Sequence, residues 1–104
     1  MAHTFETTRI TVDGVGIACY RAGIGPDTII LLHGAGVDSA LLSGAEVIPL
    51  LAHRYRVIAP DLPGYGASDR ISGEYSLAFY TSVARGIIEA FSDNPVILAG
   101  LSLG

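Results

Sequence analysis

The sequence contains no lysine and few charged residues of either sign. Charged side chains make up 15% of the 104 residues, and the six basic ones are all arginines scattered among ten acidic residues, for a formal net charge of −4. Binding the phosphates of a nucleic acid requires a clustered basic surface, so we expect no nucleic-acid partner. A chain that is half apolar and this poor in charge predicts one folded globular domain rather than a disordered segment.

Cysteine and long apolar runs are equally scarce. Cys19 has no second cysteine with which to form a disulfide, and we expect it to pack in the core. No window approaches the roughly 18 consecutive apolar residues of a membrane span, and no basic cluster with an apolar stretch behind it follows Met1. These features predict a cytoplasmic protein without a membrane partner.

Strands of two kinds are expected. An Asp-Gly turn between two β-rich runs predicts an opening β-hairpin, whereas short runs that are apolar on both faces predict strands buried within a parallel sheet. The hairpin strands lie at residues 5–12 and 15–20, and the buried strands at residues 28–32, 55–59 and 96–99.

Helical periodicity separates the buried strands. Apolar residues between positions 41 and 48 recur at helical spacing, but Gly44 and Pro49 in this stretch predict either a broken helix or a loop with a helix that restarts near Pro49. Ser76 is expected to cap a second helix. The apolar face of that helix is predicted to contain Leu77, Tyr80, Ala84, Ile87 and Phe91. The fold class is therefore α/β: a hairpin, then β-α-β-α-β in a mainly parallel, three-layer arrangement.

The last five residues fit the pattern Gly-x-Ser-x-Gly. They are Gly100, Leu101, Ser102, Leu103 and Gly104. This pattern is typical of a nucleophile elbow, a sharp strand-to-helix turn that exposes the serine hydroxyl above a sheet. The pattern alone is weak in a glycine-rich chain, but here it directly follows a predicted buried strand, where an elbow must lie.

A second glycine-rich loop follows the strand at residues 28–32. It begins with His33, Gly34, Ala35 and Gly36, small residues that let a backbone N–H approach a developing oxyanion. A third loop, rich in proline and glycine, follows the strand at residues 55–59. Functional groups of parallel sheets gather at the carboxyl ends of the strands, and all three loops lie at that end.

With these three segments in this order, the whole chain resembles the amino-terminal part of an α/β-hydrolase, the family that includes small esterases and meta-cleavage-product hydrolases. The resemblance implies that Ser102 is the catalytic nucleophile and that the backbone N–H groups of Ala35 and Leu103 form the oxyanion hole. His33, Gly34, Gly100 and Gly104 then support the oxyanion loop and the elbow. Residues 61–69 resemble a loop that shapes the floor of the pocket without a catalytic contribution.

The resemblance also shows what is missing. In this fold the triad acid and histidine follow the serine along the chain, and no residue follows Gly104. His33 is expected to be a structural hydrogen-bonding residue and His53 a surface residue. We therefore expect residues 1–104 to be the amino-terminal portion of a single domain whose carboxyl-terminal half is absent, inactive alone, with the strand at residues 96–99 as an exposed apolar edge. Its partners would be a small-molecule substrate and the missing half, or a second copy pairing through that edge.

No metal-ligand spacing and no cofactor cradle is recognisable, and hydrolysis by Ser102 needs only water. Two alternatives remain open. A near match to the dinucleotide fingerprint begins at Gly34, with Asp61 at the distance of a ribose-binding acid, which would indicate a Rossmann-like module. The chain would otherwise be a non-catalytic product that pairs with a second polypeptide supplying the missing strands.

Overall fold

The computed structural model describes residues 5–34, 39–73, 75–91 and 96–100. These residues form a five-stranded sheet in the order β1-β2-β4-β3-β5. The strands are β1 (Glu6–Val12), β2 (Val15–Ala22), β3 (Thr28–Leu32), β4 (Arg56–Pro60) and β5 (Val96–Gly100). The helices are α1 (Ala40–Gly44), α2 (Val47–Leu51) and α3 (Leu77–Phe91). No helix within these ranges is long and apolar enough to cross a membrane.

The sheet is mixed in the way that the sequence predicts. β1 and β2 form an antiparallel hairpin, β2 continues antiparallel to β4, and β4, β3 and β5 run parallel to one another. Asp13 and Gly14 join the hairpin with φ angles of 51° and 78°. Positive φ at both central residues is the geometry of a two-residue turn that matches strand twist, and Asp-Gly is a favoured pair for it.

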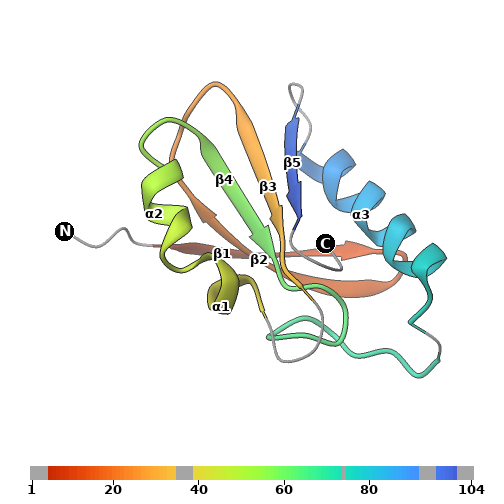
Figure 1. Cartoon of the computed structure of the whole chain (residues 1–104). Coiled ribbons are helices and arrows are strands. Elements are labelled where there is room, and N and C mark those ends of the chain that lie inside the picture. The colour runs from red at the N-terminus through yellow and green to blue at the C-terminus, as the bar shows by residue number, and fades with distance from the viewer. Residues whose placement is uncertain (1–4, 35–38, 74, 92–95, 101–104) are drawn as a thin grey trace.

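Helices cover both faces of the sheet, α1 and α2 on one side and α3 on the other (Figure 1). Alternation along β4 produces this division, since Ile58 packs with α3 whereas Val57 and Ala59 pack with α1 and α2. Cys19 is fully buried on the α3 side, as the sequence predicts. Burial raises the pKa of its thiol to about 12, and the charge of Asp61 acts in the same direction.

The first predicted helix is broken, as its glycine and proline indicate. α1 ends at Gly44 and α2 begins at Val47, so Pro49 lies in the first turn of α2. Proline is tolerated there because the N–H groups of a first helical turn have no partner within the helix.

The long helix α3 begins where Ser76 predicts it, because the Ser76 hydroxyl accepts a hydrogen bond from the N–H of Phe79 at 3.0 Å. Its buried face differs from the expected one. Leu77, expected on the apolar face, is 76% exposed at the start of the helix, while Val83 and Ile87 are fully buried. At the other end, the guanidinium of Arg56 donates to the carbonyl oxygen of Phe91 at 2.8 Å, and its positive charge complements the helix dipole.

β5 forms one edge of the sheet. It pairs with β3 on one side, and among the described strands nothing pairs with its other side. Ile97 and Leu98 are 47% and 50% exposed on it. The apolar edge expected from the sequence is therefore present.

Candidate functional site

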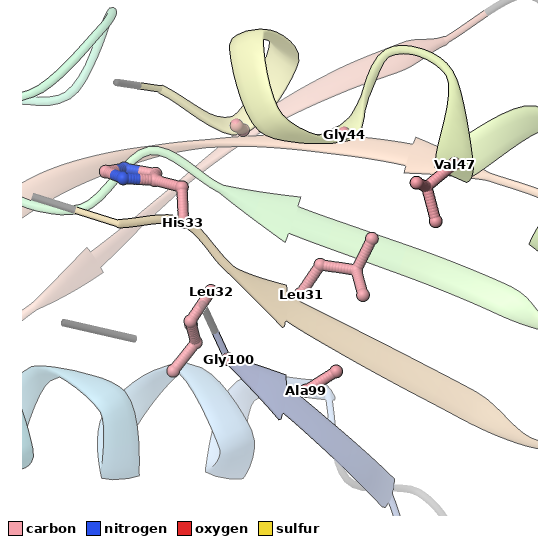
Figure 2. A pocket seen from close by; sticks show the side chains of 8 residues that line it. Leu31, Leu32, His33, Gly44, Val47, Ala99 and Gly100 are labelled. Carbon is pink, nitrogen blue, oxygen red and sulfur yellow. The ribbon is translucent and has the colours of Figure 1, made fainter. Parts of the chain in front are cut away.

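A cavity of about 210 Å³ lies at the carboxyl ends of β3 and β5 (Figure 2). Its lining consists of Leu31, Leu32, His33, Ala40, Gly44, Val47, Ala99 and Gly100. Figure 2 shows the side chains of Leu31 and Val47 pointing toward one another from β3 and the start of α2. The wall is apolar apart from His33, so this end of the sheet offers an environment in which a hydrogen bond to a developing charge is stronger than in water.

β3 and β5 bring two of the predicted loops together. Leu32, the last residue of β3, is the register partner of Gly100, the last residue of β5. Paired strands lie about 4.8 Å apart, so the chain leaves the two strands at neighbouring points of one edge. His33 and Gly34 begin one predicted loop there, and Gly100, at the end of β5, is the first residue of the Gly-x-Ser-x-Gly pattern. The predicted nucleophile Ser102, the predicted oxyanion donors Ala35 and Leu103, and Gly104 lie outside the described residues.

His33 is 2% exposed and uses both ring nitrogens in hydrogen bonds to the backbone. Its Nε2 accepts from the N–H of Leu62 at 3.0 Å, so the proton lies on Nδ1, which donates to the carbonyl oxygen of Gly34 at 2.7 Å. The ring of Tyr65 contacts it edge to face, with centroids 4.8 Å apart. This geometry assigns His33 a supporting position between two loops rather than that of a general base.

Asp61, the first residue after β4, is buried with 1% of its surface exposed. Its Oδ1 accepts from the N–H of Ala40 and its Oδ2 from the N–H of Ala67, both at 2.9 Å. Gly66 allows this approach, since its φ is +49° and an added Cβ would lie 2.2 Å from Oδ2 of Asp61. Burial raises the pKa of the Tyr20 phenol, and the charge and a side-chain hydrogen bond of Asp61 act in the same direction.

The far end of the same loop is attached to the hairpin. The carboxylate of Asp69 forms an ion pair with Arg9 and accepts from the N–H of Gly16 at 2.9 Å. The hydroxyl of Ser68 donates to the carbonyl oxygen of Asp61 and accepts from the N–H of Ala18 at 2.8 Å. Backbone and side-chain bonds thus connect the loop at residues 61–69 to β1 and β2.

The interior position of Asp61 excludes the role that the dinucleotide alternative gives it. A ribose-binding carboxylate must present its oxygens to a ligand, whereas the carboxylate of Asp61 accepts hydrogen bonds from two backbone N–H groups and from the Tyr20 phenol of the protein. His53, by contrast, is exposed as expected. Within the described ranges, no group of three or more His, Cys, Asp or Glu side chains is arranged to hold a metal ion.

Sequence reasoning placed Asp61 in a loop at the floor of the pocket but missed its bonds to residues 40 and 67. The available signal was weak: an aspartate directly after a buried strand, followed by glycines that permit close approach. This signal does not predict which N–H groups donate hydrogen bonds to the carboxylate.

Comparison with known proteins identifies the family of this chain. The sequence profile of the alpha/beta hydrolase family matches residues 29–104, so the chain belongs to that family. An uncharacterized protein of Mycobacterium tuberculosis is 40% identical over 94 residues, which are 90% of this chain and 27% of that protein. A pimeloyl-acyl-carrier-protein methyl ester esterase of Aeromonas hydrophila is 41% identical over 76 residues, 71% of this chain and 28% of the esterase.

Solved structures agree with this family. A serine hydrolase involved in carbazole degradation has a TM-score of 0.89 and 29% identity, with 96% of this chain and 39% of that chain covered. The chain therefore spans between 27% and 39% of the length of these three proteins. Relatives of the chain bear the names of an esterase, a hydrolase of a dienedioate or trienedioate and a dehalogenase, all of them hydrolytic enzymes.

Proposed function

We propose that this chain carries the nucleophile and the oxyanion hole of a serine hydrolase that cleaves a small ester, amide or carbon–carbon bond through an acyl-enzyme. The observation that carries the proposal is the pairing of Leu32 with Gly100, because Leu32 directly precedes His33 and Gly34 on one strand and Gly100 lies two positions before Ser102 on the other. The similarity to an esterase and to a serine hydrolase supports the same reaction class.

The chemistry follows from these groups. The Ser102 oxygen attacks the substrate carbonyl while a base removes its proton, and the N–H groups of Ala35 and Leu103 stabilise the resulting oxyanion. Expulsion of the protonated leaving group gives the acyl-enzyme, and water then releases the acid and restores the hydroxyl. Loss of one oxyanion donor raises the barrier by about 2.7–4 kcal/mol, so both donors matter for the rate.

A serine is the decisive residue within this family. The resemblance to this family implies an aspartate at the nucleophile position of the related dehalogenases and epoxide hydrolases. A serine at position 102 instead favours acyl transfer. The name of the dehalogenase among the relatives therefore does not carry over to this chain.

We further propose that residues 1–104 are the amino-terminal portion of one domain and are inactive alone. The base and acid of the triad would come from the remaining part of a longer protein, as the 27–39% coverage of the three relatives suggests. The exposed edge of β5 is the surface that such a part, or a second copy of the chain, would cover.

Covalent labelling of the serine tests this function. A fluorophosphonate probe reacts with a serine only when a base and an oxyanion hole activate it. We expect rapid labelling at Ser102 in the full-length protein, little in the 104-residue chain, and none in Ser102→Ala. Ser82→Ala, which removes an exposed serine of α3, is the matched control and should label like the wild type. A full-length protein that resists the probe and hydrolyses no activated ester would overturn the proposal.

A further inference from the structure

Two consecutive residues of the loop after β4 hold the chain on both sides of residues 35–38. Leu62 donates its N–H to His33, which in turn donates to the carbonyl oxygen of Gly34. Asp61 accepts the N–H of Ala40 on the other side. We propose that Asp61 is a positioning residue for the hydrolytic reaction: it fixes where the oxyanion loop ends, and thereby holds the oxyanion donor in register with the nucleophile. This inference rests on the proposed function.

The hydrogen bond between the Asp61 carboxylate and the N–H of Ala40 is buried and fixes the position of Ala40. The carboxylate is 1% exposed, and its two oxygens accept N–H groups from two different segments, at residues 40 and 67. Ala40 is the first residue of α1, and the N–H groups of a first helical turn have no partner within their own helix. A buried, charge-assisted bond therefore determines where the chain enters α1.

Asp61 is itself connected to the centre of the sheet. β4, which ends directly before Asp61, pairs with β2 on one side and with β3 on the other. The N–H of Asp61 also donates to the carbonyl oxygen of Ala18 at 2.8 Å. β3 pairs with both β4 and β5. Asp61, His33 at the start of the oxyanion loop and Gly100 at the start of the elbow therefore lie at the ends of three adjacent strands of one sheet.

Asp69 provides the matched control for this role. It lies in the same loop, and its carboxylate also accepts a backbone N–H, that of Gly16 at 2.9 Å. The partners of its carboxylate, Arg9 and Gly16, belong to β1 and β2 rather than to the residues on either side of the oxyanion loop. A general loosening of the loop would follow from loss of either carboxylate, whereas loss of positioning would follow only from loss of Asp61.

The test compares Asp61→Asn with Asp69→Asn in the full-length protein. Asparagine preserves size but presents an NH₂ group where one N–H group of the protein needs an acceptor. We measure hydrolysis of p-nitrophenyl acetate, thermal stability, and amide hydrogen exchange at Ala40 by NMR. We expect Asp61→Asn to lower kcat by about 10- to 100-fold with KM nearly unchanged, since small misplacements of a reacting group cost about 100-fold in rate. Exchange at Ala40 should accelerate at least tenfold in the same variant.

The control should keep kcat within about twofold of the wild type and leave exchange at Ala40 unchanged, because surface substitutions have small effects. Equal losses of kcat in the two variants, or unchanged exchange at Ala40 in Asp61→Asn, would overturn the positioning role while the esterase activity of the wild type stands. A wild-type protein without esterase activity would instead overturn the proposed function, and with it the catalytic part of this inference.

Discussion

Replacement of His33 should reveal how strongly the loops after β3 and β4 depend on the hydrogen bonds of one imidazole ring. In His33→Ala, the N–H of Leu62 loses its acceptor inside a site where the wild-type side chain is 2% exposed. A buried unpaired donor costs about 1–3 kcal/mol, and the lost edge-to-face contact with Tyr65 about 0.5–1.5 kcal/mol. We expect a loss of about 2–4 kcal/mol, a large share of the about 5–15 kcal/mol that stabilises a typical domain.

Two conservative variants separate the bonds of the ring. His33→Gln keeps an acceptor near the position of Nε2 for Leu62, whereas His33→Asn keeps a donor near Nδ1 for Gly34. A buried N–H without a partner is less tolerated than a carbonyl oxygen, which has two lone pairs. The order of stability should therefore be wild type, then glutamine, then asparagine, then alanine.

Urea unfolding of the full-length protein, followed by far-ultraviolet circular dichroism, measures this order. With an m value of about 2 kcal/mol per molar, the alanine variant should shift the midpoint down by about 1–2 M at constant m. His53→Ala, at an exposed position, should change stability by less than about 0.5 kcal/mol. An alanine variant as stable as the wild type, or an asparagine variant more stable than the glutamine one, would refute the reasoning.

Other predictions concern the core and the sheet edge. Gly86→Val should lower the free energy of unfolding by about 1–3 kcal/mol in calorimetry, because a Cβ there would lie 2.3 Å from Cγ1 of Val12. Burial raises the pKa of Cys19 from 9.0 to about 12, so the thiol should resist iodoacetamide in the native protein. The free energy of unfolding that the buried, neutral thiol contributes should be lost as the pH rises from 9.0 to about 12. Ile97→Lys should reduce light scattering by the 104-residue chain, since a charge on an exposed edge opposes strand pairing.

Each of these has a control and a contradicting outcome. Arg85→Ala, at an exposed position on α3 beside Gly86, should leave the free energy of unfolding nearly unchanged. If Gly86→Val changes it equally little, α3 does not pack closely on β1. For the thiol, the difference in stability between wild type and Cys19→Ala should shrink above pH 9.0, and a constant difference would contradict the raised pKa. Leu77→Lys on exposed α3 should leave scattering unchanged, and an equal effect of both lysines would argue against the edge.

Local patterns in the sequence determined most of the elements. Asp-Gly between β-rich runs specified the hairpin turn, Ser76 specified the start of α3, and the glycine and proline at positions 44 and 49 broke the first helix. These features depend on φ preferences and on hydrogen bonds within a few residues, which the order of amino acids encodes directly. Leu77, expected on the apolar face of α3, is exposed because helical spacing identifies a face but not which of its residues other elements cover.

The motifs at the ends of the strands likewise indicated the family, and they predict Ser102 as the nucleophile. They did not reveal the supporting contacts. The bond from Asp61 to Ala40 spans 21 positions, and that from Leu62 to His33 spans 29. Such bonds exist only because the sheet places β4 between β2 and β3, an order that no local pattern contains. The sequence by itself thus determined the local elements and the family, while the tertiary structure decided which buried groups connect the ends of β3 and β4, because partners distant in sequence meet only once the strands have paired.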